Sequence, residues 1–114
     1  MIFFFSVSSS SGKHWFAIFC ESKNEIQVFD SLGVSQSFIE HNFSNLAERA
    51  IGNETAVQPL NSKLCGEFTL FFLLHRYLSI DLTFDELMNA VFSTDLQKNE
   101  AIVLEFLENE HHGK

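Results

Sequence analysis

Four residues of this 114-residue chain have side chains that could together carry out thiol chemistry. His14 and Asp30 lie upstream, Gln58 follows, and Cys65 comes seven residues after Gln58 and directly before Gly66. An imidazole can act as a general base, a carboxylate can orient it, a primary amide can donate to an oxyanion, and a thiolate can attack a carbonyl carbon. In this order the four residues match what a thiol protease needs: a base, an orienter, an oxyanion donor and a nucleophile.

Cys65 is expected at the start of a helix. Pro59 and the polar residues after it are loop and helix-start signals, so the helix should begin near Leu64 or Cys65. The apolar run from Phe68 to Leu74 predicts a helix that is buried on most sides. Unsatisfied N–H groups and the helix dipole at this end favour the thiolate. The alternative is an inert packing cysteine, which is the commoner role of a lone cysteine in an apolar helix by roughly ten to one.

His14 and Asp30 are expected to lie side by side. Residues 14–20 and 25–30 are rich in aromatic and β-branched side chains, and the four residues between them suit an antiparallel hairpin. The first residue of one strand of a hairpin lies near the last residue of the other. A carboxylate beside an imidazole fixes its tautomer and stabilises the imidazolium form. The alternatives are a solvated histidine at a strand end and an aspartate that opens a turn.

Gln58 is the candidate oxyanion donor. A short strand, Thr55–Gln58, is expected to deliver it to the loop before Cys65. The side-chain amide of Gln58 and the backbone N–H of Cys65 would supply two donors, each worth about 3 kcal/mol of activation free energy. The alternative is an ordinary surface glutamine.

Taken together, these motifs resemble a known group of cysteine peptidases. His14-Trp15, the sequence VFDSLG at 28–33, Gln58 and Cys65-Gly66 are similar to those of the peptidases that include the SUMO-deconjugating enzymes and the adenovirus protease, adenain. The similarity covers nearly the whole chain, and it is greater to the viral and large-DNA-transposon branch. It implies His14, Asp30, Gln58 and Cys65 as catalytic residues.

The resemblance also implies a substrate class. Substrates of this group carry a small residue, often glycine, before the scissile bond, and Trp15 and Gly66 match a narrow substrate-binding cleft. Two activities are compatible with it: maturation of viral or transposon structural proteins, and removal of a ubiquitin-like modifier. Relatives carry a helical segment before the first strand, which is expected to be missing here. A truncated, non-catalytic remnant that acts as a binding module is therefore a third hypothesis.

Composition limits the remaining possibilities. The length predicts one domain over residues 1–110, with residues 111–114 as a frayed tail. A formal net charge of −8 makes a nucleic-acid partner unlikely. Two cysteines are too few for a disulfide framework, so an intracellular location is expected. No apolar run approaches the length of a membrane span. His111 and His112 are adjacent, which is a poor spacing for metal binding; we expect no metal, no cofactor and a monomer.

The other segments complete an α+β fold. Residues Ile2–Val7 should form a buried strand, residues 8–13 a turn, and Gln36–Ile51 a helix with apolar residues at helical spacing. Capping boxes at Thr83–Glu86 and Thr94–Gln97 should start two further helices. The expected architecture is a cysteine-protease fold: a small, mostly antiparallel central sheet, the Cys65 helix packed against it, and flanking helices.

Overall fold

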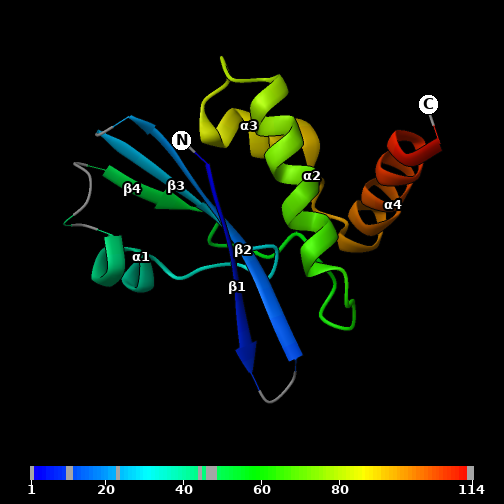
Figure 1. Ribbon diagram of the computed structural model, residues 1–114, viewed down its shortest axis with the longest axis horizontal. Coiled ribbons are helices and arrows are strands. Elements are labelled where there is room, and N and C mark those ends of the chain that lie inside the picture. The colour runs from blue at the N-terminus through cyan, green and yellow to red at the C-terminus, as the bar shows by residue number, and fades with distance from the viewer. Residues whose placement is uncertain (1, 10–11, 23, 44, 46–48, 113–114) are drawn as a thin grey trace.

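The chain has the α+β architecture predicted from its sequence (Figure 1). The structure is a computed structural model, and it describes residues 2–9, 12–22, 24–43, 45 and 49–112. In chain order the elements are β1 (Ile2–Ser9), β2 (Gly12–Ser22), β3 (Glu25–Phe29), α1 (Gln36–Phe43), β4 (Arg49–Gly52), α2 (Cys65–Leu78), α3 (Phe84–Val91) and α4 (Leu96–His112).

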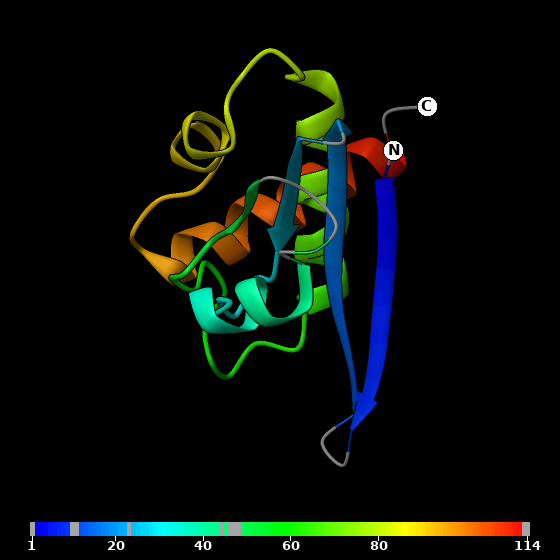
Figure 2. The same ribbon diagram turned by 90° about the vertical axis from the view of Figure 1, so that its left-hand side faces the viewer.

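The four strands form one sheet in the order β1-β2-β3-β4. The β1–β2 and β2–β3 pairs are antiparallel, and the β3–β4 pair is parallel, so the sheet is mostly antiparallel as expected. The long β1–β2 pair extends well past the shorter strands (Figure 2). Because side chains alternate along a strand, Ala17 and Phe29 join one hydrophobic cluster, while Ile18 and Val28 join another with Ile39 of α1. The sheet therefore separates α1 from the three later helices.

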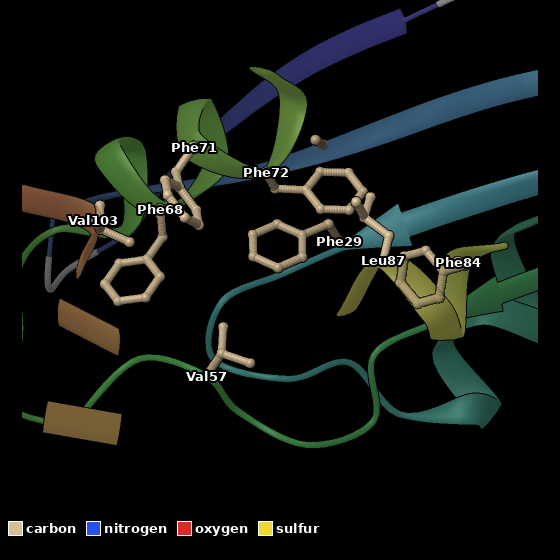
Figure 3. Packing of buried hydrophobic residues seen from close by; sticks show 9 residues of the cluster. Phe29, Val57, Phe68, Phe71, Phe72, Phe84, Leu87 and Val103 are labelled. Atoms are coloured by element: carbon tan, nitrogen blue, oxygen red, sulfur yellow. The ribbon is translucent and has the colours of Figure 1, made fainter. Parts of the chain in front are cut away.

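Aromatic rings dominate the larger cluster. Phe29, the last residue of β3, stacks on Phe72 of α2 with ring centroids 4.4 Å apart and an interplanar angle of 1°. Phe92 stacks on the same ring of Phe29 at 5.7 Å. Figure 3 shows Phe29 among the side chains of α2, with Phe84 and Leu87 of α3 beside it. This packing fixes the end of β3, and hence the start of the turn that carries Asp30, against α2.

Helix α2 begins at Cys65, as predicted, and one of its faces is exposed. Phe68, Phe71 and Phe72 face the core, whereas Leu70 and Tyr77 are exposed. Ten of its fourteen residues are buried or half-buried, so the expectation of a helix buried on most sides holds. The helix packs against β2, α4 and α3.

The predicted helix over Gln36–Ile51 was wrong in its second half. Helix α1 ends at Phe43, and Arg49–Gly52 forms β4, which pairs in parallel with β3. The helical spacing of apolar residues was overridden by this long-range pairing. Residues 55–58, predicted to be a strand, have no regular secondary structure.

The predicted turn over residues 8–13 was too long. Ser8 pairs with Lys13 and Ser9 with Gly12 in the β1–β2 ladder, and residues 10 and 11 lie outside the described part of the chain. The ladder extends to these residues because backbone pairing does not require apolar side chains. The strand predicted over residues 2–7 is present as part of β1.

The capping of the last two helices was predicted correctly in one case. At α3 the side chain of Thr83 accepts from the backbone N–H of Glu86, and Glu86 reciprocates. At α4, however, Asp95 caps the helix by accepting from the backbone N–H of Lys98 at 3.2 Å, so the predicted box at Thr94–Gln97 is absent.

The C-terminal tail also differs from the prediction. Helix α4 continues to His112, so residues 111 and 112 are helical where a frayed tail was expected over 111–114; residues 113 and 114 lie outside the described range. The helical hydrogen-bond ladder of α4 continues through these polar residues. Within the described part of the chain, no helix has the length and apolar character needed to cross a membrane.

Replacing Gly52 with alanine should destabilise the fold. An added Cβ would lie 2.7 Å from Cδ1 of Ile39, 2.8 Å from Cγ1 of Val34 and 2.9 Å from the backbone oxygen of Val28. Overpacking of this kind typically costs about 1–3 kcal/mol, measurable by urea unfolding. Gly66→Ala is the comparison and should cost less, because the three atoms nearest to its added methyl belong to the ring of Trp15, the closest at 3.2 Å. An equal loss in both variants would contradict this account of Gly52.

Removing His75 should make the fold less sensitive to acid. The imidazole packs on Phe71 and Phe106, with ring centroids 4.4 Å and 4.8 Å away, and burial lowers the pKa of His75. Below about pH 6.5 the unfolded chain therefore binds a proton that the folded chain resists, so stability falls as the pH drops from there toward the folded pKa. In His75→Leu the thermal midpoint should fall less over this range than in the wild type. His41→Leu, at an exposed position of α1, is the control and should keep the wild-type slope.

Candidate active site

His14 and Asp30 are in direct contact. Nε2 of His14 lies 2.7 Å from Oδ2 of Asp30, so the predicted pairing is present. His14 and Asp30 are not directly opposite each other across the β2–β3 pair. Ala17 pairs with Phe29, and continuing this register would set Asp30 opposite residue 16. His14 reaches Asp30 as a diagonal neighbour, a distance that long side chains can span in a sheet.

Asp30 is held by further hydrogen bonds. Its Oδ1 accepts from the backbone N–H of Leu32 at 3.0 Å. Its own backbone N–H donates to Oδ1 of Asn53 at 3.0 Å, and Nδ2 of Asn53 donates to the Asp30 carbonyl at 2.6 Å. Asn53 is buried and follows β4 directly. These contacts fix the carboxylate that orients His14.

Gln58 is buried, with only 1% of its surface exposed, so it is not the ordinary surface glutamine of the alternative interpretation. Its Oε1 accepts a hydrogen bond from the hydroxyl of Ser31, and its Nε2 donates to the carbonyl of Ser62 at 3.0 Å. The backbone N–H groups of Val57 and Gln58 both donate to the carbonyl of Ser31, at 2.8 Å and 3.0 Å. The segment before Cys65 is thereby attached to the turn that begins at Asp30.

Cys65 is the first residue of α2 and is half-buried. Leu64 occupies the N-cap position, and no side chain caps this end of the helix. The thiol therefore lies at the positive end of the helix dipole, where negative charge is favoured. Neither Cys65 nor Cys20 forms a disulfide.

The strand that carries His14 and the helix that begins with Cys65 meet at Trp15. A Cβ placed on Gly66 would lie 3.2 Å from Cδ1 of the Trp15 indole, so the ring packs close to the helix backbone. The buried hydroxyl of Thr69 hydrogen-bonds the carbonyl of Cys65 at 2.7 Å and the carbonyl of Trp15 at 3.3 Å. Since His14 precedes Trp15 and Cys65 precedes Gly66, the backbone positions of the candidate base and nucleophile adjoin one junction between β2 and α2.

Hydrogen bonds and one packing contact join several of the residues that were singled out in the sequence. His14 contacts Asp30 directly, Gln58 is joined to the same turn through Ser31, and Trp15 packs on Gly66. Three supporting residues were not predicted, and their shared feature is a buried polar side chain that bonds across long stretches of sequence: Ser31, Asn53 and Thr69. No spacing rule identifies such contacts from the sequence.

Comparison with known proteins does not assign this chain to a family. No model of a known protein family matches the chain, and no curated protein matches it. Among the described residues, no three histidine, cysteine, aspartate or glutamate side chains gather as a possible metal site.

Thr69→Val should loosen the junction between β2 and α2. The variant keeps the shape of the side chain but removes the hydroxyl that joins two carbonyl groups, which should cost roughly 1–2 kcal/mol of unfolding free energy. Trp15 is the only tryptophan, so its fluorescence reports on the junction, and we expect emission at longer wavelength as the ring gains solvent exposure. Thr69→Ser retains the hydroxyl and should keep the wild-type emission. A spectrum that is unchanged in Thr69→Val would show that the hydroxyl does not position β2.

Proposed function

We propose that this chain is a cysteine-type endopeptidase whose catalytic residues are His14, Asp30, Gln58 and Cys65. The observation that supports this most directly is the 2.7 Å contact between His14 and Asp30, located where β2 meets the first turn of α2. Histidine–carboxylate pairs beside a nucleophile recur in hydrolases of unrelated folds and are identified by geometry.

In the proposed mechanism the two nitrogens of the His14 ring have different roles. An ionised carboxylate can only accept a hydrogen bond, so Nε2 carries the proton that faces Asp30. Nδ1 is then the nitrogen that accepts the proton of the Cys65 thiol. The pair becomes an imidazolium and a thiolate, with Asp30 stabilising the positive ring and the N-terminus of α2 facing the negative sulfur.

In the acylation step, the Cys65 sulfur attacks the carbonyl carbon of a peptide bond, and a carbon–sulfur bond forms. The carbonyl oxygen becomes an oxyanion, which the side-chain amide of Gln58 and the backbone N–H of Cys65 stabilise by about 3 kcal/mol each. The carbon–nitrogen bond then breaks, and the proton held at Nδ1 of His14 passes to the departing amine.

In the deacylation step, water attacks the resulting thioester. His14 accepts a proton from this water, and the same two donors stabilise the second oxyanion. Breakage of the carbon–sulfur bond releases a carboxylic acid, and the proton returns to the thiol. No cofactor or metal takes part in this scheme, because the thiolate supplies the nucleophile.

Small residues next to the scissile bond fit the junction between Trp15 and Gly66. The backbone of Gly66 approaches the indole so closely that even a methyl group would crowd it, which leaves little room for a substrate side chain. With the sequence resemblance, this supports glycine-rich sites in viral or transposon structural proteins as substrates. A ubiquitin-like modifier ending in glycine would fit the same restriction, and a panel of both substrate types separates the two.

The setting of this activity is part of the proposal. We place it in an intracellular, reducing compartment, where a reactive thiol persists, with a protein or peptide as the partner. The net charge of −8 disfavours nucleic acid as an accessory.

His14→Ala should strongly reduce both alkylation of Cys65 and peptide hydrolysis. Loss of the general base should lower the rate of hydrolysis of a fluorogenic glycine-containing peptide by about a hundredfold or more. The rate of iodoacetamide labelling at Cys65, followed by mass spectrometry of its peptide, should fall with it. His41→Ala, an exposed histidine of α1, is the matched control and should leave both rates unchanged.

Two results would contradict the proposal. Equal labelling and hydrolysis in His14→Ala and wild type would remove His14 from the mechanism. Hydrolysis that persists in Cys65→Ser would assign the activity to something other than this thiol. A wild-type protein that cleaves no peptide and labels independently of His14 would favour the non-catalytic binding module.

A further inference from the structure

We propose that Ser31 is a positioning residue for Gln58: its hydroxyl holds and polarises the carbonyl end of the amide, whose direction the Ser62 carbonyl fixes, so that an N–H of Gln58 faces the reacting carbonyl. This inference depends on the proposed peptidase function. Ser31 lies within the VFDSLG motif, but the sequence assigned no role to it.

The two ends of the Gln58 amide have different hydrogen-bond partners. At one end, the carbonyl of Ser62 can only accept, so Nε2 must face it, and the distance is 3.0 Å. At the other end, the Ser31 hydroxyl donates to Oε1. Reversing the amide would place Oε1 against the Ser62 carbonyl, setting two acceptors against each other. The hydroxyl of Ser31 completes the arrangement by satisfying the buried carbonyl end of the side chain.

The same hydrogen bond should make Gln58 a better donor. Donation to Oε1 polarises the amide and strengthens the hydrogen bonds that its N–H groups make, an effect that is larger in a dry interior. Ser31 has no exposed surface and Gln58 has 1%, so water does not compete at this contact. An amide nitrogen carries two N–H groups, and among the described residues Nε2 makes one hydrogen bond, to Ser62. The second N–H is the one assigned to the oxyanion.

Ser31 is itself held firmly in place. Its carbonyl accepts from the backbone N–H groups of Val57 and Gln58, and the Val57 carbonyl accepts from the buried side chain of Asn99 at 3.0 Å. Ser31 also follows Asp30 directly. Two consecutive residues of one turn therefore hold two different groups. Asp30 holds His14, the proposed general base, and Ser31 holds Gln58, the proposed oxyanion donor.

The test compares a reaction that develops an oxyanion with one that does not. Peptide hydrolysis passes through a tetrahedral oxyanion, whereas alkylation of Cys65 by iodoacetamide does not. Ser31→Ala should lower kcat for a fluorogenic glycine-containing peptide by about tenfold, part of the effect of losing a whole oxyanion donor, with little change in KM. The alkylation rate of Cys65 should remain at the wild-type value, which also demonstrates that the variant is folded and its base intact.

A double-mutant cycle gives the sharper result. Gln58→Ala should lower kcat more than Ser31→Ala, and adding Ser31→Ala to Gln58→Ala should cause little further loss, because the serine acts through the glutamine. If Ser31→Ala does not fold, Ser31→Cys replaces it, since the thiol is a weak donor of nearly the same shape. A matched surface control is Ser37→Ala in α1, which should not alter kcat.

The outcomes separate this inference from the proposed function. Equal losses from Ser31→Ala in the wild-type and Gln58→Ala backgrounds would overturn the inference, as would a fall in alkylation that matches the fall in hydrolysis. In either case the peptidase function stands if His14→Ala has its expected effect. A wild-type protein without hydrolysis and with labelling that is insensitive to His14→Ala would overturn both.

Discussion

The candidate site depends on the packing of α2 against β2 and β3. Phe29 stacks on Phe72 at 4.4 Å, and Trp15 lies against the backbone of Gly66. Each candidate catalytic residue is the chain neighbour of one of the packed residues: Asp30 follows Phe29, His14 precedes Trp15, Cys65 precedes Gly66, and Gln58 follows the buried Val57. Stacked aromatic pairs contribute about 0.5–1.5 kcal/mol beyond the area they bury. The packing of the hydrophobic core therefore determines where the backbones of these polar residues lie.

Hydrogen bonds then set orientations that packing alone leaves free. The turn that begins at Asp30 is the centre of this network, since it bonds to His14 on β2, to Asn53 after β4 and to Gln58 before α2. Its partners are buried or half-buried, where hydrogen bonds are stronger and an unsatisfied group is costly. A turn held by so many hydrogen bonds has few alternative conformations, which suits the proposed role of Asp30 in orienting a base.

Local signals predicted the parts of the fold that local interactions determine. The start of α2, the Thr83 capping box and the His14–Asp30 contact followed from loop residues, capping preference and hairpin geometry. Residues 49–51 were mispredicted as helix because β4 forms through parallel pairing with β3, 24 residues earlier in the chain. Ser31 was not identified because its partner, Gln58, is 27 residues away, and a serine after an aspartate is an ordinary turn residue in sequence.

The arrangement divides the proposed chemistry between two structural units. The base, its orienter and the oxyanion donor belong to one hydrogen-bonded unit built on the sheet and the turn at Asp30, whereas the thiol belongs to α2. Close to the site, the two units meet through the indole on Gly66 and the Thr69 hydroxyl. Because reacting atoms must be aligned within a fraction of an ångström, small shifts at the junction between β2 and α2 would change the reactivity of the site more than the stability of the fold. The lack of a side chain at Gly66 lets the backbone of α2 lie close to the indole of Trp15, and this contact sets the spacing between the strand that carries His14 and the helix that begins with Cys65.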